Sequence, residues 1–364
     1  MKALQFTDID RLGLIDIPIP EPGPNEVLIR TGTTTICTSD IQDMRENAFG
    51  IDLPVVFGHE GAGTIEAVGE DVIRLAVGDR VAAHPVHPCL ECETCREGMG
   101  HLCPEMKHFG LNMPGTFAEY FVARGDRVRR IPDAVPFTAA ALAEPVCVCL
   151  EALHQANLAP GGQLLIVGDG PFGLLMARLA PRLGIERVTV SGHHPSRLAY
   201  AGSALPVVVP REGDVEPLLR EASGGRGYDA IILAVSRREM VNTCLGLLRP
   251  TGRLVIFAPM PGETGVDLFQ VLLRELEIVG AVNDRNRFDE SIAALADPAV
   301  GAGELVTHQF TLDDFAAAFE TAEHDRANAL KVAFTFDGVT LSSFLHHRAI
   351  PTIPDLTPPD LPSS

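Results

Sequence analysis

The stretch QLLIVGDGPFGLLMARLA, residues 163–180, joins a short apolar run to a helical pattern through three glycines. QLLIV has the length and composition of a buried strand, and LLMARLA has the apolar spacing of a helix. Gly168, Gly170 and Gly173 form the pattern G-x-G-x-x-G between them. The pattern alone is a weak signal, but a preceding strand and a following helix are the setting of a dinucleotide-binding loop.

Each glycine of this loop has a separate role in such a site. The first permits a tight turn, the second lets the backbone approach a pyrophosphate, and the third lets the helix pack closely on the strand. The phosphates would lie at the helix N-terminus, where backbone amides point outward. A glycine-rich turn in another kind of α/β protein is the alternative. We expect a dinucleotide to contact Gly168, Gly170, Pro171, Phe172 and Gly173.

Strand and helix patterns continue to alternate after this stretch. ERVTVSG and YDAIILAV are strand-like, REMVNTCLGLL is helix-like, and RLVIFAPM is strand-like again. This order predicts an α/β fold with a doubly wound parallel sheet of the Rossmann type. The first 150 residues instead contain short apolar runs separated by turn residues, such as EPGPNE and VGDR, which predicts a β-rich part.

Composition excludes several classes of protein. The 364 residues carry a formal net charge of −19 without a basic cluster, which argues against nucleic acid as the main partner. The N-terminal MKALQFTDID holds acidic residues, and no apolar run follows it, so neither a secretory signal nor a membrane span is expected. We therefore expect a cytoplasmic protein, in which thiols stay reduced.

Four of the eight cysteines lie in one short loop, HPCLECETCREGMGHLC, residues 87–103. A chain of this length does not need disulfides to stay folded. A redox dithiol needs only two cysteines, and four unrelated surface thiols are the remaining alternative. The spacing C-x2-C-x2-C-x7-C favours a tetrahedral zinc site held by Cys89, Cys92, Cys95 and Cys103. Four protein ligands leave no open position, so this zinc would be structural.

Three further residues are of metal-ligand type and lie beside turns or strand ends: Cys37 in TICTSD, His59 in VFGHEGAG and Glu144 in LAEPVC. Taken singly, each has an ordinary explanation. Cys37 reads as a small buried hydrophobe, His59 as a satisfied loop histidine, and Glu144 as a carboxylate at a helix N-terminus. Their order along the chain, together with the cysteine loop and the glycines, makes them candidates for a second metal site.

Seven motifs in this order resemble the zinc-dependent medium-chain dehydrogenase/reductase superfamily, and in particular its polyol and threonine dehydrogenase-like branch. The resemblance covers residues 1 to about 336. The motifs are C-T-S-D at Cys37, G-H-E at His59 and Glu60, V-G-D-R at Val77, the four-cysteine lobe, G-T-F-A-E-Y at Gly115, A-E-P at Glu144, and the glycine pattern.

The resemblance implies a division into domains. A GroES-like catalytic domain would comprise residues 1–150 and 285–336, with the structural zinc lobe at about 87–104. A Rossmann dinucleotide-binding domain would comprise residues 151–284. The remaining residues 337–364 are rich in proline and serine, and this composition predicts a tail that is flexible or docks on a neighbour.

The resemblance also implies a catalytic zinc with an open position for substrate. Cys37, His59 and Glu144 would be its ligands, and Glu60 would lie beside the metal. Asp40 would orient His59, and Ser39 would take the proton of the alcohol. Many relatives carry a histidine five residues after the cysteine, whereas this chain has Gln42, which cannot titrate.

The implied function is hydride transfer between NAD(P) and a secondary alcohol or ketone. Arg45, Asp43, Asn47 and Asn112 predict a polar substrate pocket, suited to a sugar, polyol or cyclitol, although surface positions are the alternative. An aryl-alcohol type aldehyde or ketone reductase is one rival. A non-catalytic nucleotide-sensing or structural relative is the other. The family forms dimers or tetramers, so we expect a homodimer or homotetramer that pairs through a sheet edge, for which the strand RLVIFAP is apolar enough.

The stretch ERVTVSGHHPSR bears on the identity of the cofactor. The strand ends at Val190, and Ser191 and Gly192 follow where NAD-binding folds place a carboxylate for the ribose hydroxyls. A glycine there leaves room for the 2′-phosphate of NADP. The donors to that phosphate would be His193, His194 and Arg197, which follow directly. The sequence therefore predicts two zinc ions per chain and NADP as the preferred cofactor, with NAD possible.

Overall fold

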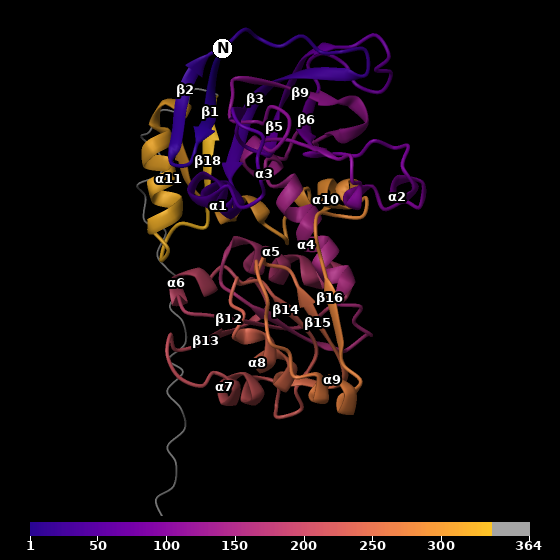
Figure 1. Cartoon of the computed structure of the whole chain (residues 1–364), viewed down its shortest axis with the longest axis vertical. Coiled ribbons are helices and arrows are strands. Elements are labelled where there is room, and N and C mark those ends of the chain that lie inside the picture. Colours follow the sequence, from indigo (N-terminus) through magenta and orange to yellow (C-terminus); the bar gives the residue numbers. More distant parts are fainter. Residues whose placement is uncertain (337–364) are drawn as a thin grey trace, which may run out of the picture.

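The structure is a computed structural model, and it describes residues 1–336. The predicted tail at residues 337–364, including His346 and His347, lies outside the described residues. Two sheet-containing parts are stacked along the long axis of the molecule (Figure 1). The N-terminal strands and the last strand share one part, and the middle of the chain forms the other.

The middle of the chain forms a six-stranded sheet in which every neighbouring pair of strands is parallel. The strands are β11 (Gln163–Val167), β12 (Arg187–Gly192), β13 (Leu205–Val208), β14 (Tyr228–Leu233), β15 (Leu248–Ile256) and β16 (Glu277–Gly280). Their order, β13-β12-β11-β14-β15-β16, is the 3-2-1-4-5-6 order of the doubly wound dinucleotide fold. The predicted Rossmann fold is confirmed.

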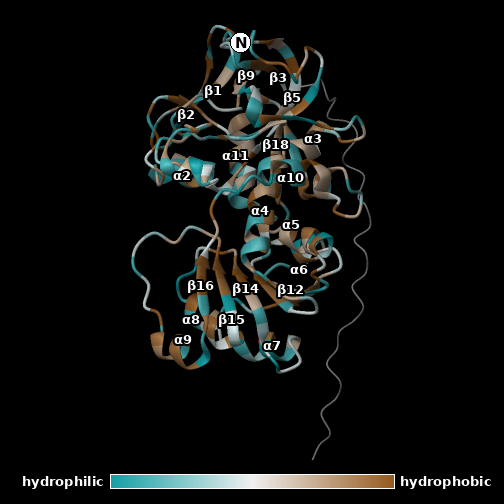
Figure 2. Ribbon diagram, turned by 90° about the vertical axis from the view of Figure 1, so that its right-hand side faces the viewer, coloured by the Kyte–Doolittle hydropathy of each residue, from teal (hydrophilic) through white to brown (hydrophobic). Residues whose placement is uncertain are grey.

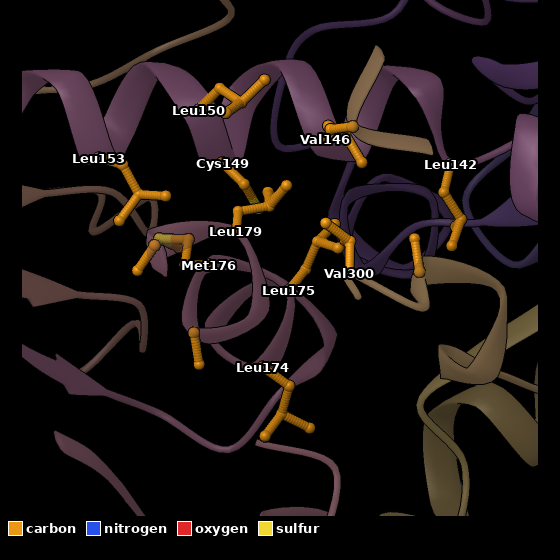
Figure 3. Close-up of a cluster of buried hydrophobic side chains, with 14 of the residues drawn as sticks. Leu142, Val146, Cys149, Leu150, Leu153, Leu174, Leu175, Met176, Leu179 and Val300 are labelled. Atoms are coloured by element: carbon orange, nitrogen blue, oxygen red, sulfur yellow. The ribbon is translucent and has the colours of Figure 1, made fainter. Parts of the chain in front are cut away.

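Helices cover both faces of this sheet because successive side chains of each strand point to opposite faces. Leu164 and Ile166 belong to one apolar cluster, whereas Leu165 and Val167 belong to another. Figure 3 shows part of the first cluster, which α4 (Ala143–Gln155) and α5 (Pro171–Leu179) form with α6 (Pro195–Leu198) and α10 (Phe288–Leu295). The second cluster includes side chains of α7 (Glu216–Ala222), α8 (Met240–Leu247) and α9 (Leu268–Arg274).

The other part contains a seven-stranded sheet that is antiparallel except where β17 pairs with β18. Its path is β10-β6-β5-β3-β18-β17, and β9 also pairs with β3. The strands are β3 (Glu26–Ile36), β5 (Glu60–Val68), β6 (Arg80–Ala83), β9 (Tyr120–Arg124), β10 (Val128–Arg130), β17 (Val306–Phe310) and β18 (Lys331–Thr335). The pairing of β18 with β3 shows that the chain returns to its first part after the parallel sheet.

Smaller elements complete the β-rich part. β1 (Lys2–Asp8), β2 (Arg11–Asp16) and β4 (Val55–Val56) form a three-stranded sheet, and β7 (Val86–His87) pairs with β8 (Lys107–His108). The remaining α-helices are α1 (Thr38–Glu46), α2 (Glu93–Arg96), α3 (Phe137–Ala140) and α11 (Phe315–His324). The 3-10 helices are η1 (Gly100–Leu102), η2 (Gly125–Arg127), η3 (Ala180–Leu183), η4 (Ala302–Leu305) and η5 (Leu312–Asp314).

One strand has a different position in the sheet from the one that the sequence suggested, and another strand was not predicted. The apolar strand RLVIFAP begins in β15, which pairs with β14 and β16, so it cannot serve as an edge; the edge strands are β13 and β16. Its apolar character reflects burial on both faces. β17 had no sequence prediction because its alternation is weak. No helix among residues 1–336 is long and apolar enough to cross a membrane.

Candidate active site

Cys37 occupies the junction between the longest strand and a helix. β3 ends at Ile36, and Cys37 is the N-cap of α1 with an extended backbone. The carboxylate of Asp40, in the first turn, accepts the Cys37 backbone amide at 2.8 Å. Its other oxygen lies 3.2 Å from Nδ1 of His59. Asp40 therefore positions both ligand candidates, and a proton held on Nδ1 leaves the Nε2 lone pair of His59 free.

Cys37, His59 and Glu60 offer a sulfur, a nitrogen and an oxygen atom that lie within 4.8 Å of one another. Glu60 is fully buried and ion-paired with Lys331, whose Nζ lies 2.6 Å from Oε2 and closer still to Oε1. Burial by itself would lower the pKa of Lys331, but the Glu60 carboxylate raises it, so this lysine stays charged. Lys331 thus already compensates the charge of Glu60.

Glu144, in the first turn of α4, lies outside that group of three but lines the same cavity as Cys37 and His59. Its Oε2 is buried and has no hydrogen-bond partner among the described residues. Burial raises the pKa of Glu144 to about 7. A buried carboxylate without a partner is unfavourable, and a cation beside it would remove the penalty. Thiolate, imidazole and carboxylate together form a donor set that fits zinc.

The cavity has a volume of about 850 Å³ and is lined from both sheet-containing parts. The β-rich part supplies Ser39, Gln42 and His108, while Phe172 and Ala258 come from the parallel-sheet part. This position, beside the carboxyl ends of the parallel strands, is where doubly wound folds bind their ligands.

The pocket prediction was correct for one of its four polar residues. Asp43 lines the cavity, and burial raises its pKa to about 6. Arg45 instead points to Asp10 and Glu323 and pairs with both. Asn47 is the left-handed C-cap of α1, and Asn112 binds the backbone at His108 and Met106. Arg45, Asn47 and Asn112 therefore have local structural roles outside the cavity.

The four lobe cysteines converge on one point and form no disulfide. Sulfur–sulfur distances are 3.9 Å between Cys89 and Cys95, 3.9 Å between Cys92 and Cys103, and 3.5 Å between Cys89 and Cys103. A zinc ion with bonds of about 2.3 Å to a sulfur tetrahedron requires edges of about 3.8 Å. Hydrogen bonds from the backbone amides of Glu91 and Cys92 lower the pKa of Cys89 to about 6, which favours the thiolate.

The glycine loop has the geometry that a bound pyrophosphate requires. Gly168 has φ +134°, a conformation that disfavours side chains. A Cβ at Gly173 would lie 2.1 Å from the Gly168 carbonyl oxygen, so helix and strand pack too closely for alanine. A Cβ at Gly170, the N-cap of α5, would meet nothing within 4 Å. That open space lies at the helix N-terminus, with Pro171 as its first residue.

A carboxylate that sequence reasoning missed lies against the end of β12, which runs to Gly192 and not only to Val190. Asp169, inside the glycine pattern, accepts the amides of His193 and His194, each at 2.8 Å, and contacts Nδ1 of His194 at 3.0 Å. A Cβ at Gly192 would lie 2.3 Å from Cβ of Asp169. Asp169 therefore fills the space left by the missing side chain of Gly192 and fixes the loop that follows.

The predicted phosphate donors have partners within the protein. Nδ1 of His193 lies 3.0 Å from the Val209 carbonyl oxygen, and Arg197 donates to the carbonyl of Ala329 at 2.8 Å. Nε2 of His194 accepts from Arg211, at 2.8 Å. Arg211 is an exposed cation that the sequence motifs do not single out.

Comparison with known families accounts for this combination of sites. The model of the alcohol dehydrogenase GroES-like domain matches residues 23–133, and that of the zinc-binding dehydrogenase matches residues 171–297. The chain belongs to the zinc-binding dehydrogenase family. Membership makes it an enzyme of the zinc-dependent, NAD(P)-linked alcohol dehydrogenase class, and it confirms the predicted GroES-like and Rossmann combination.

Individual relatives of this zinc-binding dehydrogenase belong to the predicted branch. Sorbitol dehydrogenase of Bacillus subtilis is 31% identical over 339 residues, which are 91% of this chain and 96% of that protein. L-threonine 3-dehydrogenase of Anaeromyxobacter dehalogenans is 31% identical over 320 residues, 86% and 92% of the two chains. An Escherichia coli structure described as a short chain alcohol dehydrogenase complexed with NADH has a TM-score of 0.86 and 27% identity, covering 92% of this chain and 99% of its own.

Proposed function

We propose that this dehydrogenase transfers a hydride between a nicotinamide dinucleotide and a secondary alcohol or ketone of a polyhydroxylated substrate. The observation that carries the proposal is the buried Oε2 of Glu144, which has no partner within residues 1–336 and lines, with Cys37 and His59, a cavity that also reaches the dinucleotide loop at Phe172. Relatives named for sorbitol and other sugar alcohols support the substrate class.

In this proposal, Cys37, His59 and Glu144 hold the catalytic zinc, and Cys89, Cys92, Cys95 and Cys103 hold the structural one. Glu60 lies beside the catalytic metal with its charge compensated by Lys331. Zinc bound there supplies Lewis-acid chemistry, which lowers the pKa of an alcohol or polarises a carbonyl.

The residues of the chain handle the proton and the orientation of the reactants. Ser39 lines the cavity two residues from Cys37, and its hydroxyl takes the alcohol proton. Gln42 also lines the cavity, but its amide cannot titrate, so the proton would leave Ser39 through water, or through a ribose hydroxyl if a bound cofactor supplied one. Asp40 keeps His59 in one tautomer, and α4 carries Glu144 into the cavity.

A substrate screen tests this function. Polyols, amino-alcohols and simple secondary alcohols are compared as substrates of the zinc-loaded protein with NADP and with NAD. We expect the highest kcat/KM with polyols. Faster reduction of aromatic aldehydes than oxidation of any polyol would favour the aryl-alcohol reductase instead. Turnover of no substrate, with dinucleotide binding retained, would favour the non-catalytic alternative.

We infer a preference for NADP, supported by the absence of a carboxylate within β12 itself and by the exposed cation Arg211, which donates to His194 beside the end of this strand. The carboxylate of Asp169 is already bound by two amides and by His194, so it orders this loop. Arg211 can pair with a 2′-phosphate, which carries about −1.5 to −2 charges.

The test of this preference compares kcat/KM for NADP and NAD in the wild type and in Arg211→Ala. We expect NADP to be preferred and the variant to lose about tenfold with NADP alone. Equal losses with both cofactors, or a wild type that prefers NAD, would contradict the inference. Gly192→Asp is a poor probe because its Cβ would collide with Asp169.

An exposed apolar helix bears on the assembly state of the protein. Four apolar side chains of α9 are exposed, between 65% and 72%: Leu268, Phe269, Leu272 and Leu273. This helix precedes the edge strand β16 and is brown at one end of the molecule (Figure 2). We propose that α9 and β16 pair with a second copy in a cytoplasmic homodimer or homotetramer. Light scattering of Leu272→Lys should show monomers; a monomeric wild type at micromolar concentration would contradict this.

The division into a catalytic domain (1–150 and 285–336) and a cofactor domain (151–284) also remains a proposal. Helix α4 runs through residue 150, so the first boundary falls inside an element that touches both parts. Its packing against α5 and β5 supports a connection that is rigid at this point.

A further inference from the structure

We propose that His108 is a substrate-binding residue whose Nε2 accepts a hydrogen bond from a hydroxyl group of the substrate other than the one that is oxidised. This inference rests on the proposed function and assigns the recognition of a second hydroxyl to one side chain.

The protein itself fixes the tautomer of His108. Nδ1 of the ring lies 2.7 Å from the carbonyl oxygen of Phe109. A carbonyl can only accept, so Nδ1 carries the proton and donates it. In the neutral ring, Nε2 then has a lone pair and can only accept. Among residues 1–336, the ring forms a hydrogen bond through Nδ1 alone, and Nε2 has no partner there.

The backbone around His108 is held in place on both sides. His108 ends the short strand β8 and pairs there with Val86. Its amide donates to Oδ1 of Asn112 at 2.8 Å, and Nδ2 of Asn112 donates to the carbonyl of Met106 at 3.0 Å. Asn112, which the sequence suggested as a pocket residue, is therefore a positioning residue for His108.

His108 faces the reacting centre from within the cavity. Its ring centroid lies 5.6 Å from that of His59, a proposed zinc ligand. Both histidines line the cavity, together with Ser39 and Gln42. An acceptor at this distance from the metal site can reach a second functional group of a small substrate whose first group lies at His59.

The cavity wall around His108 is largely apolar, with Phe49, Ile51, Met106 and Leu111 among its side chains. An acceptor in such a wall loses water when substrate enters, and a hydrocarbon group would leave it unpaired. A hydroxyl group pairs with it. Sites built to bind a hydroxyl reject analogues that lack it far more strongly than apolar pockets discriminate size. His108 would therefore favour diols and polyols over simple alcohols.

The test uses 2,3-butanediol and 2-butanol, which share a carbon skeleton and differ by one hydroxyl. The readout is the ratio of kcat/KM for the diol to that for the mono-alcohol, measured with the zinc-loaded enzyme. We expect His108→Phe to lower this ratio about tenfold, mainly through the diol, and His108→Gln to return it to within about threefold of wild type, since the glutamine oxygen also accepts. Met106→Leu is the matched control, which should alter both substrates equally.

The outcomes separate this inference from the proposed function. An unchanged ratio in His108→Phe, with both alcohols still oxidised, would overturn the role of His108 and leave the dehydrogenase activity standing. A lower ratio that His108→Gln did not restore would also overturn it, because the effect would then be one of packing. A wild type that oxidised neither alcohol nor any polyol would refute both.

Discussion

Glu60 is fully buried and Glu144 has one buried carboxylate oxygen, and the two carboxylates have opposite surroundings in the same site. Glu60 is ion-paired with Lys331 and also accepts from the Thr35 hydroxyl, whereas one oxygen of Glu144 has no partner among the described residues. Taking a charge out of water is costly unless it is paired. The charge of Glu60 is compensated by the fold itself, so a bound cation matters more for Glu144.

The Glu60–Lys331 pair gives the first prediction. Lys331→Met leaves a buried carboxylate without its cation, which should lower the free energy of unfolding by about 3–5 kcal/mol. Glu60→Gln in the same chain should recover part of that loss, because no uncompensated charge then remains. Chemical unfolding of the metal-free single and double variants measures the coupling. Additive losses in the double variant would show that the two residues do not interact.

Asp43 predicts a pH dependence. Burial raises its pKa from 3.8 to about 6, so the unfolded chain releases this proton at lower pH than the folded one. Stability is therefore lost as pH rises from about 4 to 6 and does not change further above that range. Asp43→Asn removes this loss. Relative to wild type, the variant should be more stable at pH 7 than at pH 4.5, by a free energy of unfolding on the order of 1–3 kcal/mol. Melting temperatures of both proteins at the two pH values measure this difference. An equal difference at both pH values would contradict the prediction.

At the scale of elements, the β11–loop–α5 unit shows how one short stretch creates a site. The strand is buried on both faces, the loop turns through Gly168, and α5 starts at Pro171, whose missing amide hydrogen costs nothing at a helix start. Gly173 allows the close approach, and Gly170 leaves space for a ligand.

The two glycines make a matched pair for the next prediction. Gly173→Ala should destabilise the protein, since its Cβ would collide with the Gly168 backbone 2.1 Å away. Gly170→Ala should keep the wild-type melting temperature but weaken cofactor binding, because its methyl group enters open space at the helix N-terminus. Thermal unfolding and fluorescence titration with NADPH distinguish the two effects. Normal cofactor binding by Gly170→Ala would place the pyrophosphate elsewhere.

Elements that depend on local pattern could be predicted, and contacts that depend on tertiary pairing could not. The alternation after residue 160, the glycine loop and the cysteine lobe all have signals within a few residues. Lys331, Asp169 and His108 have roles that arise from segments far apart in the chain, such as the 271-residue separation of Lys331 and Glu60. A lysine within the apolar run ALKVAFTF was the one available hint of a buried ion pair.

At the scale of the whole molecule, the two proposed metal sites differ in their construction, and one is structural whereas the other is catalytic. The four-cysteine lobe closes on itself near the surface, so a metal bound there would contribute folding free energy. The site at Cys37 lies in the cavity between the two sheets, where Cys37 follows the end of β3, His59 precedes β5 and Glu144 lies in the first turn of α4. Those elements are fixed by their own cores, so the fold does not depend on the catalytic metal.

Metal content and turnover, measured on the same samples of wild type, Cys37→Ser and Cys92→Ser, test the central claim most directly. We expect two zinc ions per chain and alcohol oxidation in the wild type. We expect one zinc, a near-normal melting temperature and no detectable oxidation in Cys37→Ser, and a markedly lower melting temperature in Cys92→Ser. A Cys37→Ser variant that retained most of its alcohol oxidation, or a fully active wild type with one zinc per chain, would contradict that claim.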